Sequence, residues 1–364
     1  MKLKNYYLSC FILVFFVLIS ISSVVAYEPE VISFPSTGSP MFYDWNIQKG
    51  LLACFYADVD SSNITIVDNV VIQAKNGTNL KILDSPHADF ISAVKWSPDG
   101  TMLALASFDG TVSIWDSTTF NKQQTIIINE SIIHLDWVTA NSNLVVTTTS
   151  SNAYLVKINP SNHTEDFITL LSLPETNSFN RPLAWNQNND SFLIAINNTI
   201  YFFNENQNNA YSNISFHNKY IEQISLHPSG KVLVVAFSFD PAIIFNLTTM
   251  GETFLDEEFY IHDSAIWNPA GDYLFVSNSL DSLQTILDYT TLTIYVRNSP
   301  PMRPFAWIDD ETIIGVSKNG FQIWNIYEYY PELEKPTSNA PGLLFTEFFL
   351  AIPIITYFIR KNHS

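Results

Sequence analysis

The chain has 364 residues and a formal net charge of −18, because 35 acidic residues outnumber 17 basic ones. A surface this acidic repels the phosphates of DNA and RNA, so we expect no nucleic acid partner. The only two cysteines, Cys10 and Cys54, cannot build a disulfide framework, so stability must come from a large apolar core.

Residues 1–26 have the layout of a secretory signal peptide. Two lysines precede an apolar run from Phe11 to Ile21, and the segment ends in the small residue Ala26. This order predicts export, with cleavage after Ala26. An uncleaved signal anchor is the alternative, because the apolar region is already established at Tyr6.

A repeated unit of roughly 40 residues fills the region 27–330. Its clearest copy, Ile91 to Asp116, alternates apolar and polar residues with a period of two, which predicts strands. Turns at 98–100 and at Asp109-Gly110 separate three strands, and the stretch that follows has room for a fourth. Four strands in about 40 residues predict one blade of a β-propeller.

Seven copies recur, and each ends its first strand in a large anchor residue, at spacings of 40 to 51 residues. The anchors are Trp45, Trp96, Trp137, Trp185, Leu226, Trp267 and Trp307. We expect them to pack between neighbouring blades, together with Trp115 and Trp324 of the third strands. The segment Val31 to Phe34 precedes the first copy and can supply the outer strand of the last blade. The predicted fold is an all-β, seven-bladed, closed propeller.

Several motifs resemble the consensus of the WD-repeat (WD40-type) β-propeller family. Ser97-Pro98-Asp99-Gly100 follows an anchor, and Phe108-Asp109-Gly110 precedes the closing Ile114-Trp115-Asp116. Ile323-Trp324-Asn325 repeats the closing motif in the last copy. The resemblance covers roughly Val31 to Asn325 and implies a β-propeller fold.

The resemblance also implies a polar network inside each blade, made of His, Ser or Thr, Asp and Trp. The family places a His nine residues before the anchor, and His87 and His217 stand at that offset. Leu105 occupies the position where the family would have Ser or Thr. We therefore expect the network to be incomplete.

The end of the chain predicts a membrane anchor. A Pro-containing linker, 331–341, leads into an apolar run over 342–359 and a basic tail at 360–364. Eighteen residues at the helical rise of about 1.5 Å cover about 27 Å, close to a ~30 Å hydrocarbon core. We expect a transmembrane helix with a cytoplasmic tail, and a propeller that is extracellular or lumenal. The alternative is an archaeosortase-type sorting signal at Pro341-Gly342, with a lipid replacing the helix.

Eight Asn-x-Ser/Thr sequons fall in the propeller region and are candidates for glycosylation in an exported protein. They are Asn63, Asn76, Asn129, Asn162, Asn189, Asn197, Asn213 and Asn246. An Asn-rich chain also produces sequons by chance, so we expect a glycan on at least one of them in a host that glycosylates exported proteins.

The sequence contains no Gly-x-Ser-x-Gly elbow, His-Glu-x-x-His motif, phosphate loop or dinucleotide fingerprint. A loop from Asp58 begins like a calcium site, but Asn63 and Asn69 replace the required Gly and Glu. We therefore expect a non-catalytic protein without metal or cofactor. The alternative is an exported hydrolase or lyase whose residues converge on the central channel from several blades.

The predicted function is that of a membrane-anchored module that binds or scaffolds a protein or a glycan on one propeller face. Candidate contact residues lie in the turns between second and third strands: Asp60, Phe108, Phe239, Asp240 and Lys318. Exposed Phe108 and Phe239 beside acidic residues would suit a contact surface, since aromatic side chains dominate interfaces. The alternative is that both rings pack on their own blades.

Overall fold

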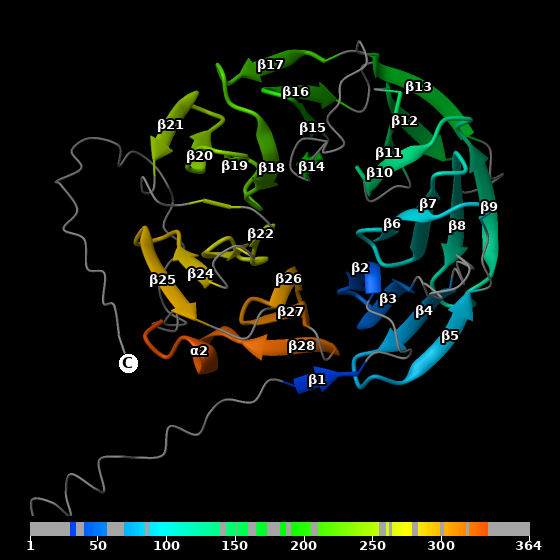
Figure 1. The fold of residues 1–364 in the computed structure, drawn as a ribbon, viewed down its shortest axis with the longest axis horizontal. Helices are drawn as coiled ribbons and strands as arrows, with labels where there is room; N and C mark the ends of the chain where they lie inside the picture. Colours follow the sequence, from blue (N-terminus) through cyan, green and yellow to red (C-terminus); the bar gives the residue numbers. More distant parts are fainter. Residues whose placement is uncertain are drawn as a thin grey trace, which may run out of the picture.

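Seven four-stranded antiparallel sheets surround a central axis in the computed structural model (Figure 1). The structure describes residues 30–33, 40–56, 69–83, 87–138, 143–150, 152–158, 165–172, 183–186, 191–204, 210–254, 260–261, 264–278, 283–298, 302–317 and 320–333. The prediction of an all-β, seven-bladed propeller is confirmed. The predicted signal peptide, membrane helix and tail lie outside these residues. Within these ranges no helix combines the length and the apolar character that crossing a bilayer requires.

Each blade is a meander whose first strand lies nearest the axis (Figure 1). Blade 1 contains β2 (Pro40–Asn46), β3 (Leu51–Tyr56), β4 (Asn69–Ala74) and β5 (Asn79–Leu83). Blade 2 contains β6 (Ile91–Trp96), β7 (Met102–Ser107), β8 (Thr111–Asp116) and β9 (Lys122–Ile127). Blade 3 contains β10 (Ile132–Trp137), β11 (Asn143–Thr148), β12 (Asn152–Ile158) and β13 (Glu165–Ser172). Blade 4 contains β14 (Leu183–Asn186), β15 (Ser191–Ile196), β16 (Thr199–Asn204) and β17 (Ser212–Ser215).

The remaining blades follow the same order. Blade 5 contains β18 (Ile221–Leu226), β19 (Val232–Phe237), β20 (Ile243–Asn246) and β21 (Gly251–Phe254). Blade 6 contains β22 (Ser264–Trp267), β23 (Tyr273–Asn278), β24 (Leu283–Asp288) and β25 (Thr293–Asn298). Blade 7 contains β26 (Met302–Trp307), β27 (Thr312–Ser317) and β28 (Gly320–Asn325), and the short helix α2 (Ile326–Tyr329) follows it.

The outer strand of blade 7 comes from the other end of the chain. Strand β1 (Glu30–Ile32) pairs antiparallel with β28, with Val31 opposite Gln322. Ile32 is buried against Phe321 in the same apolar cluster. A side chain at Gly320 would overlap the carbonyl oxygen of Ile32, so the closing strand requires glycine there. The predicted closure of the ring is confirmed.

The second strands form the centre of the core. Every residue of β3, β11, β15 and β19 is buried, because each sheet is covered by a neighbouring sheet on both sides. This explains why β3 and β19 are apolar throughout and why β11 and β15 have apolar centres, instead of alternating patterns. Cys54 lies in β3 as a buried free thiol, as expected, and burial raises its pKa well above the ordinary value.

The anchors join neighbouring blades. Several indole N–H groups donate a hydrogen bond to the carbonyl of the residue that precedes the anchor of the previous blade. The pairs are Trp137 with Lys95 at 3.0 Å, Trp267 with Ser225 at 3.3 Å and Trp307 with Ile266 at 3.1 Å. The predicted packing of these tryptophans between blades is confirmed, and it includes a directional bond.

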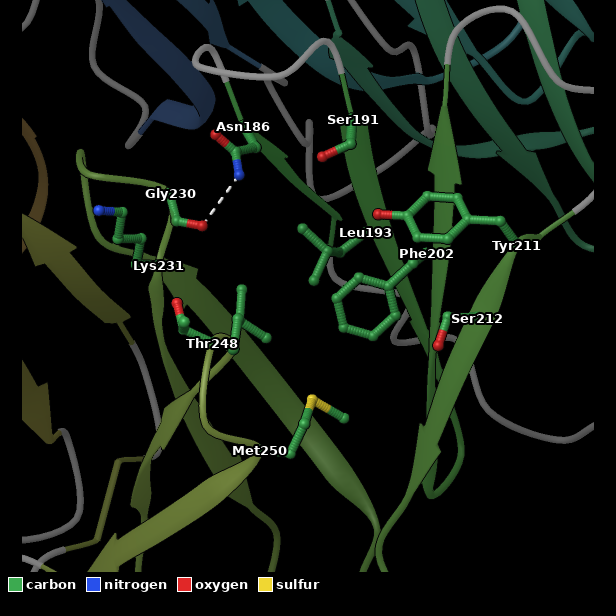
Figure 2. A pocket seen from close by; sticks show the side chains of 11 residues that line it. Asn186, Ser191, Leu193, Phe202, Tyr211, Ser212, Gly230, Lys231, Thr248 and Met250 are labelled. Atoms are coloured by element: carbon green, nitrogen blue, oxygen red, sulfur yellow. Dashed lines mark hydrogen bonds between the residues drawn. The ribbon is translucent and has the colours of Figure 1, made fainter.

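A second contact between blades runs in the opposite direction. The residue after an anchor donates to a carbonyl in the first turn of the next blade. The pairs are Asn46 with Gly100, Asn186 with Gly230 and His227 with Gly271 at 2.9 Å each, and Asn268 with Asp310 at 3.3 Å. Figure 2 shows the bond from Asn186 to Gly230. Gly230 has φ +69, and any side chain there would overlap the Asn186 amide, so this inter-blade clasp requires glycine.

His227 is the variant member of these clasps, and its protonation can be assigned. The backbone N–H of Ser229 donates to Nδ1 at 2.9 Å, so the proton that reaches the Gly271 carbonyl belongs to Nε2. Burial lowers the pKa of His227 below its ordinary value of 6.5. The folded protein therefore holds this imidazole in its neutral form.

We expect His227→Asn to lower the free energy of unfolding at pH 7.5 less than His227→Ala does, because Asn makes the same clasp in three other blades. Both variants lose the ring contacts with Trp267 and Tyr289, and His227→Ala loses about 1 kcal/mol more with the hydrogen bond. Below pH 6.5 the unfolded wild-type chain binds a proton at this residue that the folded chain resists, so wild-type stability should fall more steeply than that of His227→Asn. Denaturant unfolding followed by tryptophan fluorescence measures both effects. Equal destabilisation by Asn and Ala would contradict the clasp.

Candidate functional site

The two faces of the ring carry different loops. Because each blade has four antiparallel strands, the chain returns to the face from which it started before it enters the next blade. The connections between blades and the turns between second and third strands therefore share one face, which we call the upper face. The turns between first and second and between third and fourth strands lie on the lower face.

The upper face of blade 5 presents two aromatic rings to solvent. Phe239, in the turn between β19 and β20, is 88% exposed, and Tyr220, just before β18, is 63% exposed. A backbone bond from Ser238 to the carbonyl of Tyr220 (3.0 Å) holds the two segments together. Within the described part of the chain neither ring packs on another aromatic ring. Because 88% of Phe239 is exposed, this residue does not pack on its own blade.

A charged pair borders these rings. The Asp240 carboxylate lies 3.7 Å from the Lys219 ammonium, which also lies 4.9 Å from the centre of the Phe237 ring. Both charges are partly exposed, so the pair contributes little to stability. It places one charge of each sign beside Phe239. Phe239, Tyr220, Lys219 and Asp240 together form what we call the blade 5 site.

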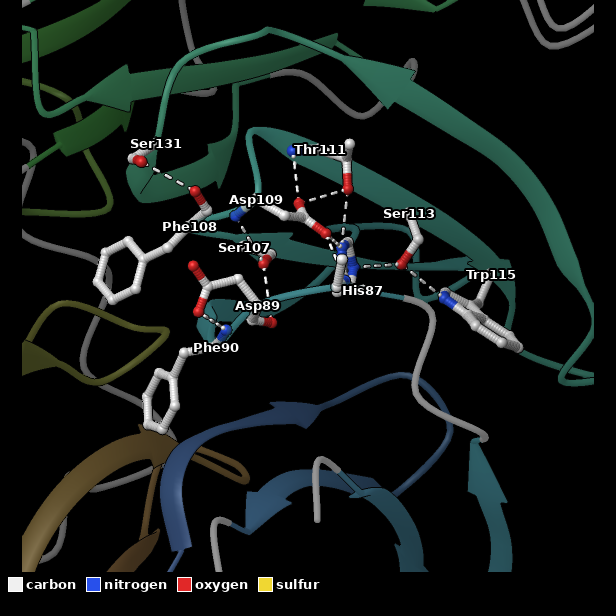
Figure 3. A network of polar contacts seen from close by, with 11 residues as sticks. His87, Asp89, Phe90, Ser107, Phe108, Asp109, Thr111, Ser113, Trp115 and Ser131 are labelled. Carbon is white, nitrogen blue, oxygen red and sulfur yellow. Dashed lines mark hydrogen bonds and ion pairs between the residues drawn. The ribbon is translucent and has the colours of Figure 1, made fainter. Parts of the chain in front are cut away.

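Phe108 behaves differently from Phe239. It is 39% exposed and stacks on Phe90, with 6.3 Å between ring centres and 19° between planes. Both rings are visible in Figure 3, and the Ser131 hydroxyl donates to the Phe108 carbonyl at 2.8 Å. Phe108 thus packs partly on its own blade. It belongs to blade 2, three blades away from Phe239, so the two predicted contact residues do not form one patch.

The polar network of blade 2 is continuous (Figure 3). The Trp115 indole donates to the Ser113 hydroxyl at 2.9 Å, and that hydroxyl lies 2.9 Å from His87 Nε2. His87 Nδ1 lies 2.8 Å from the Thr111 hydroxyl, which donates to the Asp109 carboxylate at 2.7 Å. Since the Thr111 proton is used on Asp109, we assign the proton of His87 to Nδ1, so that Ser113 donates to Nε2.

The expectation of an incomplete network is wrong for this blade. Ser113 on β8 supplies the hydroxyl that Leu105 on β7 cannot. Burial lowers the pKa of His87, and this outweighs the opposing effect of the Asp109 carboxylate 3.4 Å away. A neutral His87 agrees with the assigned chain of donors. The network fixes the connection that carries Phe90 and the turn that carries Phe108.

Three charged residues gather around the axis, and we call them the axial triad. Asp44, Lys95 and Asp136 each precede the anchor on β2, β6 and β10, which belong to adjacent blades. The corresponding residues of the other blades are Ala184, Ser225, Ile266 and Ala306. The Asp44 carboxylate accepts the backbone N–H of Trp96 at 2.7 Å. The triad is not among the residues predicted from sequence, although comparing the residue before each anchor across the copies reveals it.

Burial raises the pKa of Asp44 to about 6, against the opposing effect of Lys95 and with a further contribution from Asp136. The carboxylates of Asp136 and Asp44 raise the pKa of Lys95. We expect the Asp44 carboxyl to titrate near pH 6 in NMR spectra of protein labelled with 13C-aspartate. Lys95→Met should raise this pKa, because the ammonium stabilises the carboxylate, and Asp136→Asn should lower it. A wild-type pKa near 3.8 would contradict this description of the triad.

The other predicted residues are distributed as follows. Asp60, Lys318, Asn63, Asn162 and Asn189 lie outside the described residues. Asn76, Asn129 and Asn213 are exposed, whereas Asn197 and Asn246 are half-buried. In the sequons of Asn76 and Asn246, the side-chain oxygen accepts the N–H of the sequon threonine at 3.1 and 2.9 Å. Among the described residues, no group of three or more His, Cys, Asp or Glu side chains can hold a metal ion.

Comparison with known proteins agrees with this geometry. Residues 77–116 match the family model WD40, described as "WD domain, G-beta repeat", and this segment contains β5 to β8 and the blade 2 network. The solved β-propeller domain of Cps50 (Swd1) from Myceliophteria thermophila is similar in fold, with a TM-score of 0.63 and 14% sequence identity. The match covers 80% of this chain and 98% of that domain. No curated protein matches the chain in sequence.

Proposed function

Because the chain is a WD-repeat β-propeller, we propose that it is a non-catalytic platform that binds a protein partner at the blade 5 site. The observation that carries the proposal is Phe239, a phenyl ring that is 88% exposed on the upper face. Tyr220 beside it is 63% exposed and extends the apolar surface.

Two exposed aromatic rings in one turn region are costly unless a partner covers them. Burying an aromatic side chain removes a large apolar area from water, at roughly 25 cal/mol per Å². Aromatic residues surrounded by polar groups are also the usual energetic centres of protein interfaces. The partly exposed Lys219 and Asp240 supply both signs of charge at the rim, where charge complementarity selects a partner.

The location of the platform is part of the same proposal and rests on the sequence. Residues 1–26 support export, and residues 342–359 support an anchor that keeps the propeller outside the cytoplasmic membrane. A glycan partner on the same face is the alternative to a protein. The acidic surface supports solubility in that compartment.

To test the site, the tagged full-length chain is purified from native membranes and the co-purifying proteins are quantified. The variant Phe239→Ala/Tyr220→Ala should reduce recovery of the specific partner by at least about tenfold, because truncating a central aromatic costs about 2 kcal/mol or more. Ile127→Ala is the matched control, since Ile127 is 58% exposed on the outer strand β9. Unchanged recovery in the double variant, or equal loss in the control, would contradict the proposal.

The location is tested by the intact mass of the same preparation. We expect a chain that begins at Tyr27 and ends at Ser364, with any glycan present as added mass. A chain that begins at Met1 would contradict cleavage of the signal. A chain that ends near Pro341 and carries a lipid would contradict the transmembrane anchor.

A further inference from the structure

Four turns of the lower face share one backbone arrangement. In each, an Asp or Asn side chain accepts the N–H groups two and three residues ahead, as Asn246 does from Thr248 and Thr249 at 2.9 and 3.0 Å. The next residue has a positive φ of 54 to 63, and the four residues are Gly50, Phe120, Met250 and Leu292. Glycine adopts this conformation easily, whereas a bulky side chain is strained in it.

Packing accounts for one of the three strained side chains. Phe120 is partly buried and packs against the apolar cluster between blades 1 and 2. Met250 and Leu292 are 56% and 37% exposed, and within the described ranges neither belongs to an apolar cluster between blades. A contact outside the described chain would explain why a bulky apolar residue is kept at a position that suits glycine.

A third apolar side chain stands beside these two on the lower face. Tyr211, just before β17 in blade 4, is 52% exposed and lines the same cleft as Met250 of blade 5 (Figure 2). Leu292 occupies the corresponding turn of blade 6. Three consecutive blades therefore present a large exposed apolar side chain on one face, and we call these three residues the lower rim. Apolar groups gathered on one face mark a contact surface.

The route of the chain indicates which surface faces the lower rim. Strand β28 ends at the lower face, where the Ile326 N–H of α2 donates to the Glu311 carbonyl at 2.8 Å. The described chain ends at Leu333, which is buried in the cluster between blades 6 and 7. Residues 334–341 then span at most about 28 Å before the apolar run that begins at Gly342. An anchor in that run would hold blades 6 and 7, and the neighbouring lower rim, close to a bilayer.

We propose that the lower rim inserts its three apolar side chains into the interfacial layer of this bilayer. The proposal rests on the membrane anchor that is part of the proposed function. A tyrosine suits this layer, because its ring is apolar and its hydroxyl reaches the headgroups. Asp272 and Asp310 lie in neighbouring turns of the lower face and repel anionic lipids, so the surface that fits is a zwitterionic bilayer. This orientation leaves the blade 5 site facing away from the membrane, accessible to its partner.

The test uses the full-length chain in nanodiscs of phosphatidylcholine. The fluorophore NBD is attached to a cysteine introduced at Met250 or Leu292, in a Cys10→Ser background in which the buried Cys54 is the only other thiol. Lipids with a spin label near the headgroup should quench these probes by about twofold or more, because interfacial side chains lie at that depth. Probes at Ile127 and Phe239, which are exposed on an outer strand and on the upper face, are the controls and should not be quenched.

The variant Met250→Gly/Leu292→Gly separates membrane contact from folding. Glycine suits both positive φ values, as Gly50 does in the same turn, so the temperature of unfolding should stay the same or rise. Quenching of a probe at Tyr211→Cys should nevertheless fall to the level of the controls, because the rim has then lost its apolar side chains.

The possible failures can be told apart. A full-length chain that does not assemble into nanodiscs would contradict the anchor and this proposal together. A chain that assembles, but whose probes at Met250 and Leu292 are quenched no more than the controls, would overturn the membrane contact and leave the anchor standing. Stronger quenching in nanodiscs of anionic phosphatidylglycerol would overturn the assignment of a zwitterionic surface.

Discussion

The contact between neighbouring innermost strands is the constraint on which the rest of the molecule depends. Among the described residues, three anchor indoles reach back to the previous blade, and in four blades the residue after the anchor reaches forward to the next. Directional bonds therefore join several pairs of neighbouring blades, and burial of the second strands adds apolar stabilisation. Because the blades are fixed in this way, the loops of both faces have a defined place. The blade 5 site is one consequence of this arrangement.

The fold follows from local sequence, which explains why it could be predicted. Strands with a period of two, Asp-Gly turns and anchor residues all lie within one repeat. The closing strand could also be predicted, because its segment precedes the first of the seven repeats. The blade 2 network could not be predicted correctly, because the required hydroxyl was sought on β7. Ser113 lies two residues before Trp115 on β8, so both side chains are on the same face of the strand, where the indole reaches the hydroxyl.

A contact residue could be predicted from the sequence only where a single turn determines whether its side chain is exposed. Phe239 could be named because an aromatic residue in a hairpin turn has little to pack on. Phe108 has the same position in its repeat, but Phe90 from the preceding connection stacks on it. No sequence pattern predicts that contact. The axial triad combines residues of three blades, so it cannot be recognised in any single repeat.

Closure by β1 also sets the order of events during synthesis. The first strand of the ring to be made is the last to find its partner, because β28 is the final strand of the ring to be made. Between the synthesis of β28 and its pairing with β1, the edge of β28 has no neighbouring strand, and its backbone groups can pair with another chain. Such a long-range contact also slows folding. A chain in which β1 has not yet paired is therefore an open ring whose seventh blade lacks its outer strand.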